Sequence, residues 1–106
     1  MKNDFDTNQY IKDLQKSDDY FHTFINRDTL AAGILYLEPG EDDTQTPHDF
    51  DEVYYVIEGD GFLKINKKDY PVSAGKAFFV AKDVEHYFFG NSKKLIVLYF
   101  FGCPDT

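Results

Sequence analysis

His48 and Glu52 stand four residues apart, and imidazole and carboxylate together are ligands for a borderline divalent metal ion. Residues four apart share a face on a helix and on a strand, so the spacing alone does not choose between them. Composition does, because Pro47 stops a helix and residues 53–57 (VYYVI) are strand formers. On a strand, the alternate side chains of residues 46–56 share one face. We therefore predict that His48 and Glu52 point into the same interior.

The elements that must position this pair are short strands. Apolar and aromatic runs alternate with turn signals at the spacing of roughly 8–12 residues that is typical of an all-β sandwich or barrel. Residues 58–61 (EGDG) are predicted to form a hairpin turn in which two glycines supply positive φ. The last strand is almost wholly apolar, so we expect it to be covered on both faces. The expected strands are residues 20–26, 30–37, 46–57, 62–66, 70–72, 77–81, 86–89 and 94–101.

Residues 1–19 are polar and acidic, with few apolar positions. Tyr10 or Ile11 with Leu14 fits one side of a short helix, which Asp6 or Thr7 would cap. We expect this segment to be a peripheral helical extension of the domain.

Composition limits the function classes. The chain has 106 residues, typical of one domain, and its 42% hydrophobic and 18% aromatic residues suffice for a packed core. The net charge of −8 leaves no basic footprint for nucleic acid and disfavours an anionic membrane surface. A single cysteine, Cys103, excludes an internal disulfide, and neither a secretory signal nor a membrane-spanning apolar run is visible. A cytoplasmic protein without nucleic-acid or membrane partners is expected.

Two blocks of the sequence have the spacing of a known pair of motifs. In the first, five residues separate Gly40 from Thr46-Pro47-His48, three more lead to Glu52, and six more lead to Gly59. In the second, the corresponding positions are Gly75, Ala81, Asp83, His86 and Gly90. Over residues 30–101 the chain resembles the cupins, whose motifs read G-x5-HxH-x3,4-E-x6-G and G-x5-PxG-x2-H-x3-N.

The resemblance implies an all-β fold, the cupin or jelly-roll antiparallel β-barrel (double-stranded β-helix), with a short N-terminal helix. Residues 1–106 would be a single cupin domain, with residues 1–19 peripheral and residues 30–101 forming the barrel. It also implies that His48, Glu52 and His86 bind a divalent metal inside the barrel. The family's first histidine is replaced by Thr46. No organic cofactor is expected.

The replacement leaves alternatives open. The Thr46 hydroxyl could hydrogen-bond a metal-bound water, or Asp42, Asp43 or Gln45 could supply an oxygen ligand in its place. A cavity in which Glu52 pairs with a histidine without metal is the alternative to a metal site. The third histidine, His22, is interpreted as an ordinary residue.

Tyr54 shares the inward face with Glu52 and is, with Thr46, the candidate catalytic group. The aromatic residues Tyr54, Phe62, Phe79 and Phe88 could line a substrate pocket or fill the core. On the opposite face, Val53, Tyr55 and Ile57 are apolar and need a cover, for which a second copy in a homodimer is the expectation.

The function favoured by these residues is that of a metal-dependent enzyme acting on a small molecule, with oxygenase-type chemistry if the metal is Fe²⁺. Zn²⁺ or Mn²⁺ would indicate isomerase, lyase or hydrolase chemistry, and the ligand types do not choose between Fe, Zn, Mn and Ni. The alternative is a non-catalytic small-molecule binding module. A metal-free sugar epimerase ranks last, because no basic phosphate-binding cluster is visible.

Overall fold

The computed structural model describes residues 2–45 and 47–102. Over these residues the fold consists of eight strands and one helix, as predicted. The helix is α1 (Thr7–Gln15). The strands are β1 (Phe21–Asn26), β2 (Ala31–Leu37), β3 (Glu52–Glu58), β4 (Phe62–Ile65), β5 (Lys68–Pro71), β6 (Ala77–Val80), β7 (His86–Phe89) and β8 (Leu95–Phe101).

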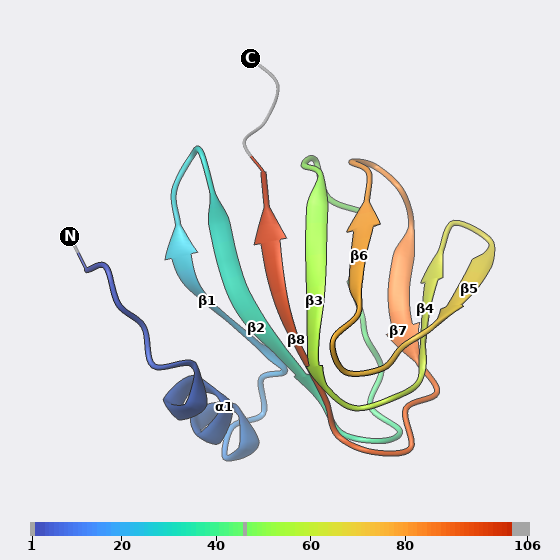
Figure 1. Ribbon diagram of the computed structural model, residues 1–106, viewed down its shortest axis with the longest axis horizontal. Coiled ribbons are helices and arrows are strands. Elements are labelled where there is room, and N and C mark those ends of the chain that lie inside the picture. The colour runs from blue at the N-terminus through green and yellow to red at the C-terminus, as the bar shows by residue number, and fades with distance from the viewer. Residues whose placement is uncertain (1, 46, 103–106) are drawn as a thin grey trace.

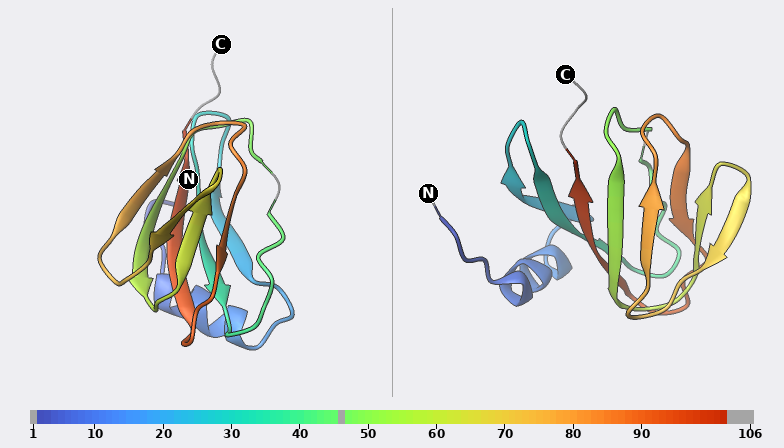
Figure 2. Two further views of the ribbon diagram at one scale, coloured as in Figure 1. Left: turned by 90° about the vertical axis from the view of Figure 1, so that its right-hand side faces the viewer. Right: turned by 45° about the horizontal axis from the view of Figure 1, so that its top comes forward.

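The strands form two antiparallel sheets, and Figure 1 shows the larger one as five neighbouring arrows in the order β1-β2-β8-β3-β6. The smaller sheet has the order β5-β4-β7. Figure 2 shows from the side how the smaller sheet covers one face of the larger. The all-β barrel prediction is confirmed.

The main core lies between the two sheets. Alternate residues of β3 are buried there, Tyr54 and Val56 fully, and they pack with Leu63 of β4 and Phe88 of β7. This alternation is the period-two pattern of a strand with one buried face. The interior is therefore apolar except where polar side chains gather at one end.

Helix α1 covers part of the outer face of the larger sheet, below β1 and β2 in Figure 1. The Asp6 side chain caps it by accepting a hydrogen bond from the Gln9 backbone N–H, which confirms Asp6 as the N-cap. Leu14 packs on Ile34, Tyr36 and Ile96. The first half of β8 is thereby covered on both faces, as its apolar sequence predicts.

Two sequence predictions about element boundaries are wrong. Strand β3 begins at Glu52, so His48 lies in an irregular connection and not on a strand. Residues 58–61 do not form a hairpin turn, because β3 and β4 belong to different sheets and do not pair. Gly59 and Gly61 do have positive φ, at 118° and 108°, and they turn the chain from one sheet to the other. No described helix has the length and apolar character needed to cross a membrane.

Candidate metal centre

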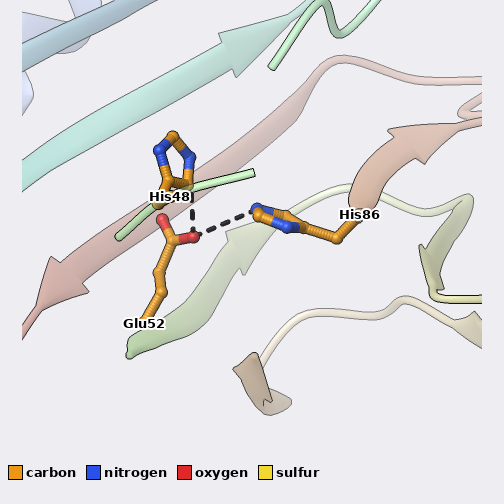
Figure 3. Close-up of side chains that lie close together, drawn as sticks. All are labelled: His48, Glu52 and His86. Carbon is orange, nitrogen blue, oxygen red and sulfur yellow. Dashed lines mark ion pairs between the residues drawn. The ribbon is translucent and has the colours of Figure 1, made fainter. Parts of the chain in front are cut away.

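Two segments far apart in the chain, residues 48–52 and the start of β7, bring His48, Glu52 and His86 together (Figure 3). Glu52 is the first residue of β3, and His86 is the first residue of β7 in the other sheet. His48 precedes β3, and its segment is held by the Asp83 backbone N–H, which donates to the His48 carbonyl at 2.7 Å. The sequence prediction that these three side chains meet is correct, although His48 reaches the site from a connection.

Glu52 lies between the two imidazoles. Its Oε1 is 3.1 Å from His86 Nε2 and 3.9 Å from His48 Nε2. Glu52 is only 2% exposed, and among the described residues no donor forms a hydrogen bond to this oxygen. A buried carboxylate oxygen without a hydrogen bond is costly unless a positive charge compensates it, so this oxygen marks a place for a cation.

His86 is oriented for binding through Nε2. Its Nδ1 lies 2.9 Å from the Val84 carbonyl, so Nδ1–H donates there and Nε2 faces Glu52. A backbone carbonyl that takes the other ring proton is the usual support of a metal-binding histidine. Burial by itself lowers the pKa of His86, but the Glu52 carboxylate and the Val84 carbonyl outweigh it and raise that pKa.

The pKa of His48 shifts in the opposite direction. Burial lowers its pKa, and the neighbouring His86 adds to this, whereas Glu52 opposes it in part. A neutral imidazole is the form that binds a metal. Its Nε2 lies 3.1 Å from Gln45 Oε1, so Gln45 is also part of the site.

Tyr54, the predicted catalytic residue, brings its hydroxyl into the same cluster. This hydroxyl donates to Gln45 Oε1 at 2.8 Å and lies 3.0 Å from His86 Nε2. Burial first, and then the charge of Glu52, raise the pKa of Tyr54 well above its ordinary value, so its hydroxyl holds its proton. Thr46, the second predicted catalytic residue, lies outside the described residues.

The three candidates for a replacement oxygen ligand differ in position. Asp42 is exposed. Asp43 Oδ2 accepts hydrogen bonds from the Phe88 backbone N–H and from Gln45 Nε2. Gln45 Oε1 alone contacts the side chains of the metal centre, namely those of His48 and Tyr54.

A cavity of about 340 Å³ opens onto the centre. The sequence analysis missed most of its aromatic wall, which comes from two segments and consists of Tyr20, Phe21, Tyr99 and Phe101. Tyr99 and Phe101 occupy alternate positions of the last strand, so the sequence could have indicated that both face the same side. Of the proposed pocket aromatics, Tyr54 lines the cavity and Phe88 is in the core. Phe62 and Phe79 are 41% and 61% exposed and do neither, which corrects that prediction.

The residues present fit a divalent metal ion. One ligand atom from each of His48, Glu52 and His86 lies within 4.8 Å of the others, and a buried anionic oxygen between them has no hydrogen bond. Two imidazoles and one carboxylate leave coordination positions open for a substrate.

Comparisons with known proteins point to one family. Residues 33–101 match the cupin domain model. An uncharacterised protein of Streptomyces coelicolor is 30% identical over 90 residues, which span 85% of this chain and 86% of that protein.

Solved structures share the fold. An RmlC-like cupin family protein with a double-stranded β-helix fold, from Methanocaldococcus jannaschii, has a TM-score of 0.72 at 15% identity, over 81% of this chain and 84% of that chain. The DMSP lyase DddQ from Ruegeria pomeroyi has a TM-score of 0.71 at 17% identity, over 77% of this chain and 45% of that chain. Similarity at these identities concerns the fold alone.

Proposed function

The chain belongs to the cupin family, and from this premise we propose that it is a metal-dependent enzyme that acts on a small molecule. His48, Glu52 and His86 hold the metal, and the aromatic cavity beside them holds the substrate. The observation that supports this best is Glu52 Oε1, a buried carboxylate oxygen without a hydrogen bond between two imidazoles.

The metal, the cavity wall and Tyr54 have different roles in the proposed reaction. When bound, the metal supplies Lewis acidity and, if it is iron(II), the redox chemistry of oxygenases. The aromatic wall of the cavity excludes water and orients the substrate. Tyr54, whose hydroxyl keeps its proton, is placed to donate a hydrogen bond to a substrate oxygen.

Oxygenase-type chemistry is the reaction class we propose first. Two histidines and one carboxylate with open positions form the ligand set of non-haem iron(II) oxygenases. A lyase or isomerase is the second candidate, and the Tyr54 hydroxyl favours it, because a hydrogen-bond donor beside the metal would stabilise the negative charge that such reactions develop on a substrate oxygen. The similarity in fold to a DMSP lyase agrees with this second candidate.

The alternative from another class is a non-catalytic binding protein whose cavity takes up a small molecule without metal. In that case the raised pKa of His86 is the relevant observation, because a protonated His86 would compensate the charge of Glu52. Metal content separates the two functions.

Elemental analysis of protein purified without an affinity tag or added metal tests the proposal. We expect about one divalent metal per chain in the wild type and none in His48→Ala. His22→Ala is the matched control, because His22 is exposed and contacts Tyr10 of the helix, and this variant should keep its metal. Iron would support the oxygenase, and zinc, manganese or nickel the lyase or isomerase.

A wild type that binds no metal, even after incubation with Fe²⁺, Mn²⁺ and Zn²⁺, would contradict the metalloenzyme and leave the binding protein. Equal metal loss in His48→Ala and His22→Ala would also contradict it, because the loss would then not depend on the centre.

A further inference from the structure

Beside the three ligands discussed above, the centre contains two further polar side chains, those of Tyr54 and Gln45. We propose that Gln45 Oε1 is a fourth protein ligand of the metal, an inference that rests on the metal site proposed in the preceding section. The cupin motif has its first histidine at position 46 of this sequence. Gln45, one residue earlier, would supply an oxygen ligand in place of that histidine.

Polar atoms of five side chains form a closed ring of neighbours. Gln45 Oε1 lies 3.1 Å from His48 Nε2, which lies 3.9 Å from Glu52 Oε1. Glu52 Oε1 lies 3.1 Å from His86 Nε2, which is 3.0 Å from the Tyr54 hydroxyl. The ring closes with the 2.8 Å hydrogen bond from Tyr54 to Gln45.

Two of these separations, 3.1 Å from Gln45 to His48 and 3.1 Å from Glu52 to His86, match those of adjacent ligands that share a metal ion. The 3.9 Å between His48 Nε2 and Glu52 Oε1 corresponds to a wider angle at the ion. Nitrogen and oxygen ligands lie about 2.1 Å from a zinc-like ion, so adjacent ligands at angles of roughly 90–110° are about 3.0–3.4 Å apart. Gln45 Oε1 has this separation from His48 Nε2. An amide oxygen has two lone pairs, and Tyr54 uses one of them, so the other is free for a metal when His48 is itself a ligand.

The orientation of the amide is fixed by its surroundings. Gln45 Nε2 donates to Asp43 Oδ2 at 2.7 Å, so the oxygen of the amide faces His48 and Tyr54. Asp43 is in turn held by the Phe88 backbone N–H of β7, which donates to the same Oδ2 at 2.9 Å. An oxygen that is held in place before a ligand arrives loses little entropy on binding.

The inference also predicts a metal preference. Two imidazoles, one carboxylate and one amide oxygen give equal numbers of nitrogen and oxygen donors. Oxygen donors suit Mn²⁺ and other hard ions better than a third imidazole does. Gln45→His should therefore shift the preference of the centre from Mn²⁺ toward Zn²⁺ and Cu²⁺.

Titration of the metal-free protein with Co²⁺ in competition with a chelator tests the inference. The visible spectrum of bound Co²⁺ changes with coordination number, so it responds to the loss of a ligand and not to loosened packing alone. We expect Gln45→Leu to bind Co²⁺ at least about tenfold more weakly than wild type and to show altered visible bands. Even residues that only hydrogen-bond to a metal ligand commonly change metal affinity by about tenfold or more. The matched control is Gln9→Leu on the exposed face of α1, which should bind as wild type does.

Gln45→Asn is the second variant, in case Gln45→Leu does not fold. It keeps the amide but shortens the side chain by one methylene group, so it should bind Co²⁺ more weakly than wild type and with altered visible bands. Unchanged affinity and spectrum in Gln45→Leu or in Gln45→Asn, with wild type binding one Co²⁺, would overturn the role of Gln45 and leave the three-ligand site standing. No binding by wild type would instead reject the metal site itself.

Discussion

Gly33 and Tyr99 are paired across β2 and β8, and the glycine makes room for the tyrosine. A Cβ at position 33 would overlap the Tyr99 hydroxyl and would lie 2.5 Å from the His22 carbonyl oxygen. The Tyr99 hydroxyl is hydrogen-bonded to Thr23, and its ring forms part of the cavity wall. The missing side chain of one residue therefore fixes the position of an aromatic side chain that faces the site.

Gly33→Ala should lower the free energy of unfolding by about 1–3 kcal/mol, the usual cost of forcing an extra carbon into a packed region. Urea unfolding followed by circular dichroism measures it. Gly102→Ala is the control, because the nearest atom to a Cβ there is the Asp51 carbonyl oxygen at 3.8 Å. Equal stability of both variants would show that Tyr99 can move away at no cost.

At the level of residues, motif spacing predicted His48, Glu52 and His86, and strand alternation predicted Tyr54. The inward position of Gln45 could not be predicted, because it depends on Asp43, which is held by Phe88, 45 residues away in sequence. Contacts of this range are a property of the folded chain.

Among the elements, the connection between β3 and β4 is fastened to the connection between β7 and β8 by one side chain. Asp60 Oδ1 accepts the backbone N–H groups of Ser92 and Lys93, at 2.9 and 3.1 Å, and its Oδ2 accepts the Ser92 hydroxyl. The Ser92 hydrogen bond is the main reason that the pKa of Asp60 lies below its ordinary value of 3.8.

Asp60→Ala should destabilise the protein at neutral pH and matter less in acid. Because the folded state lowers the pKa of Asp60, its stabilising effect is present above about 3.8 and is lost as the pH falls through the folded value. Urea unfolding of wild type and variant between pH 7 and pH 2.5 should show the difference shrinking at the acidic end. Asp42→Ala, at an exposed carboxylate, should show little difference at any pH.

Element types were predictable, but not all their partners. The period-two pattern and the turn residues predicted eight strands and the two positive-φ glycines at 59 and 61. A hairpin and a crossing between sheets use the same glycines, so local sequence did not tell them apart. The predicted start of β3 was also too early. The backbone bends at residues 49 and 50, which the alternation of side chains does not indicate, so the strand begins at Glu52.

For the whole molecule, the outer face of the larger sheet is covered by α1 over β2 but exposed over β3 and β6. Val53 of β3 pairs with Phe79 and Phe100 on either side, and Tyr55 is the next outward residue. These four side chains are 36–61% exposed, a contiguous apolar patch of the kind that marks an interface. We propose that a second copy of the chain covers this patch in a symmetric homodimer, the state expected from the sequence.

Phe79→Glu should convert the dimer to a monomer, because two carboxylates would face each other near the symmetry axis or lie in an apolar interface. Sedimentation velocity over a range of concentrations measures this. Phe62→Glu is the control, since Phe62 is an exposed aromatic of the smaller sheet, 41% exposed, outside the patch. A wild type that sediments as a monomer at all concentrations would contradict the homodimer.

His48 and Gln45 lie on the connection that precedes β3, whereas Glu52 and His86 begin strands in different sheets. None of the described residues of that connection belongs to a ladder, so we expect substitutions there to leave the strand registers in place. Donor atoms there can therefore change one at a time while the strands hold the carboxylate and one imidazole fixed. The metal centre that we propose could therefore diverge in metal preference and reaction by single substitutions that leave the barrel intact.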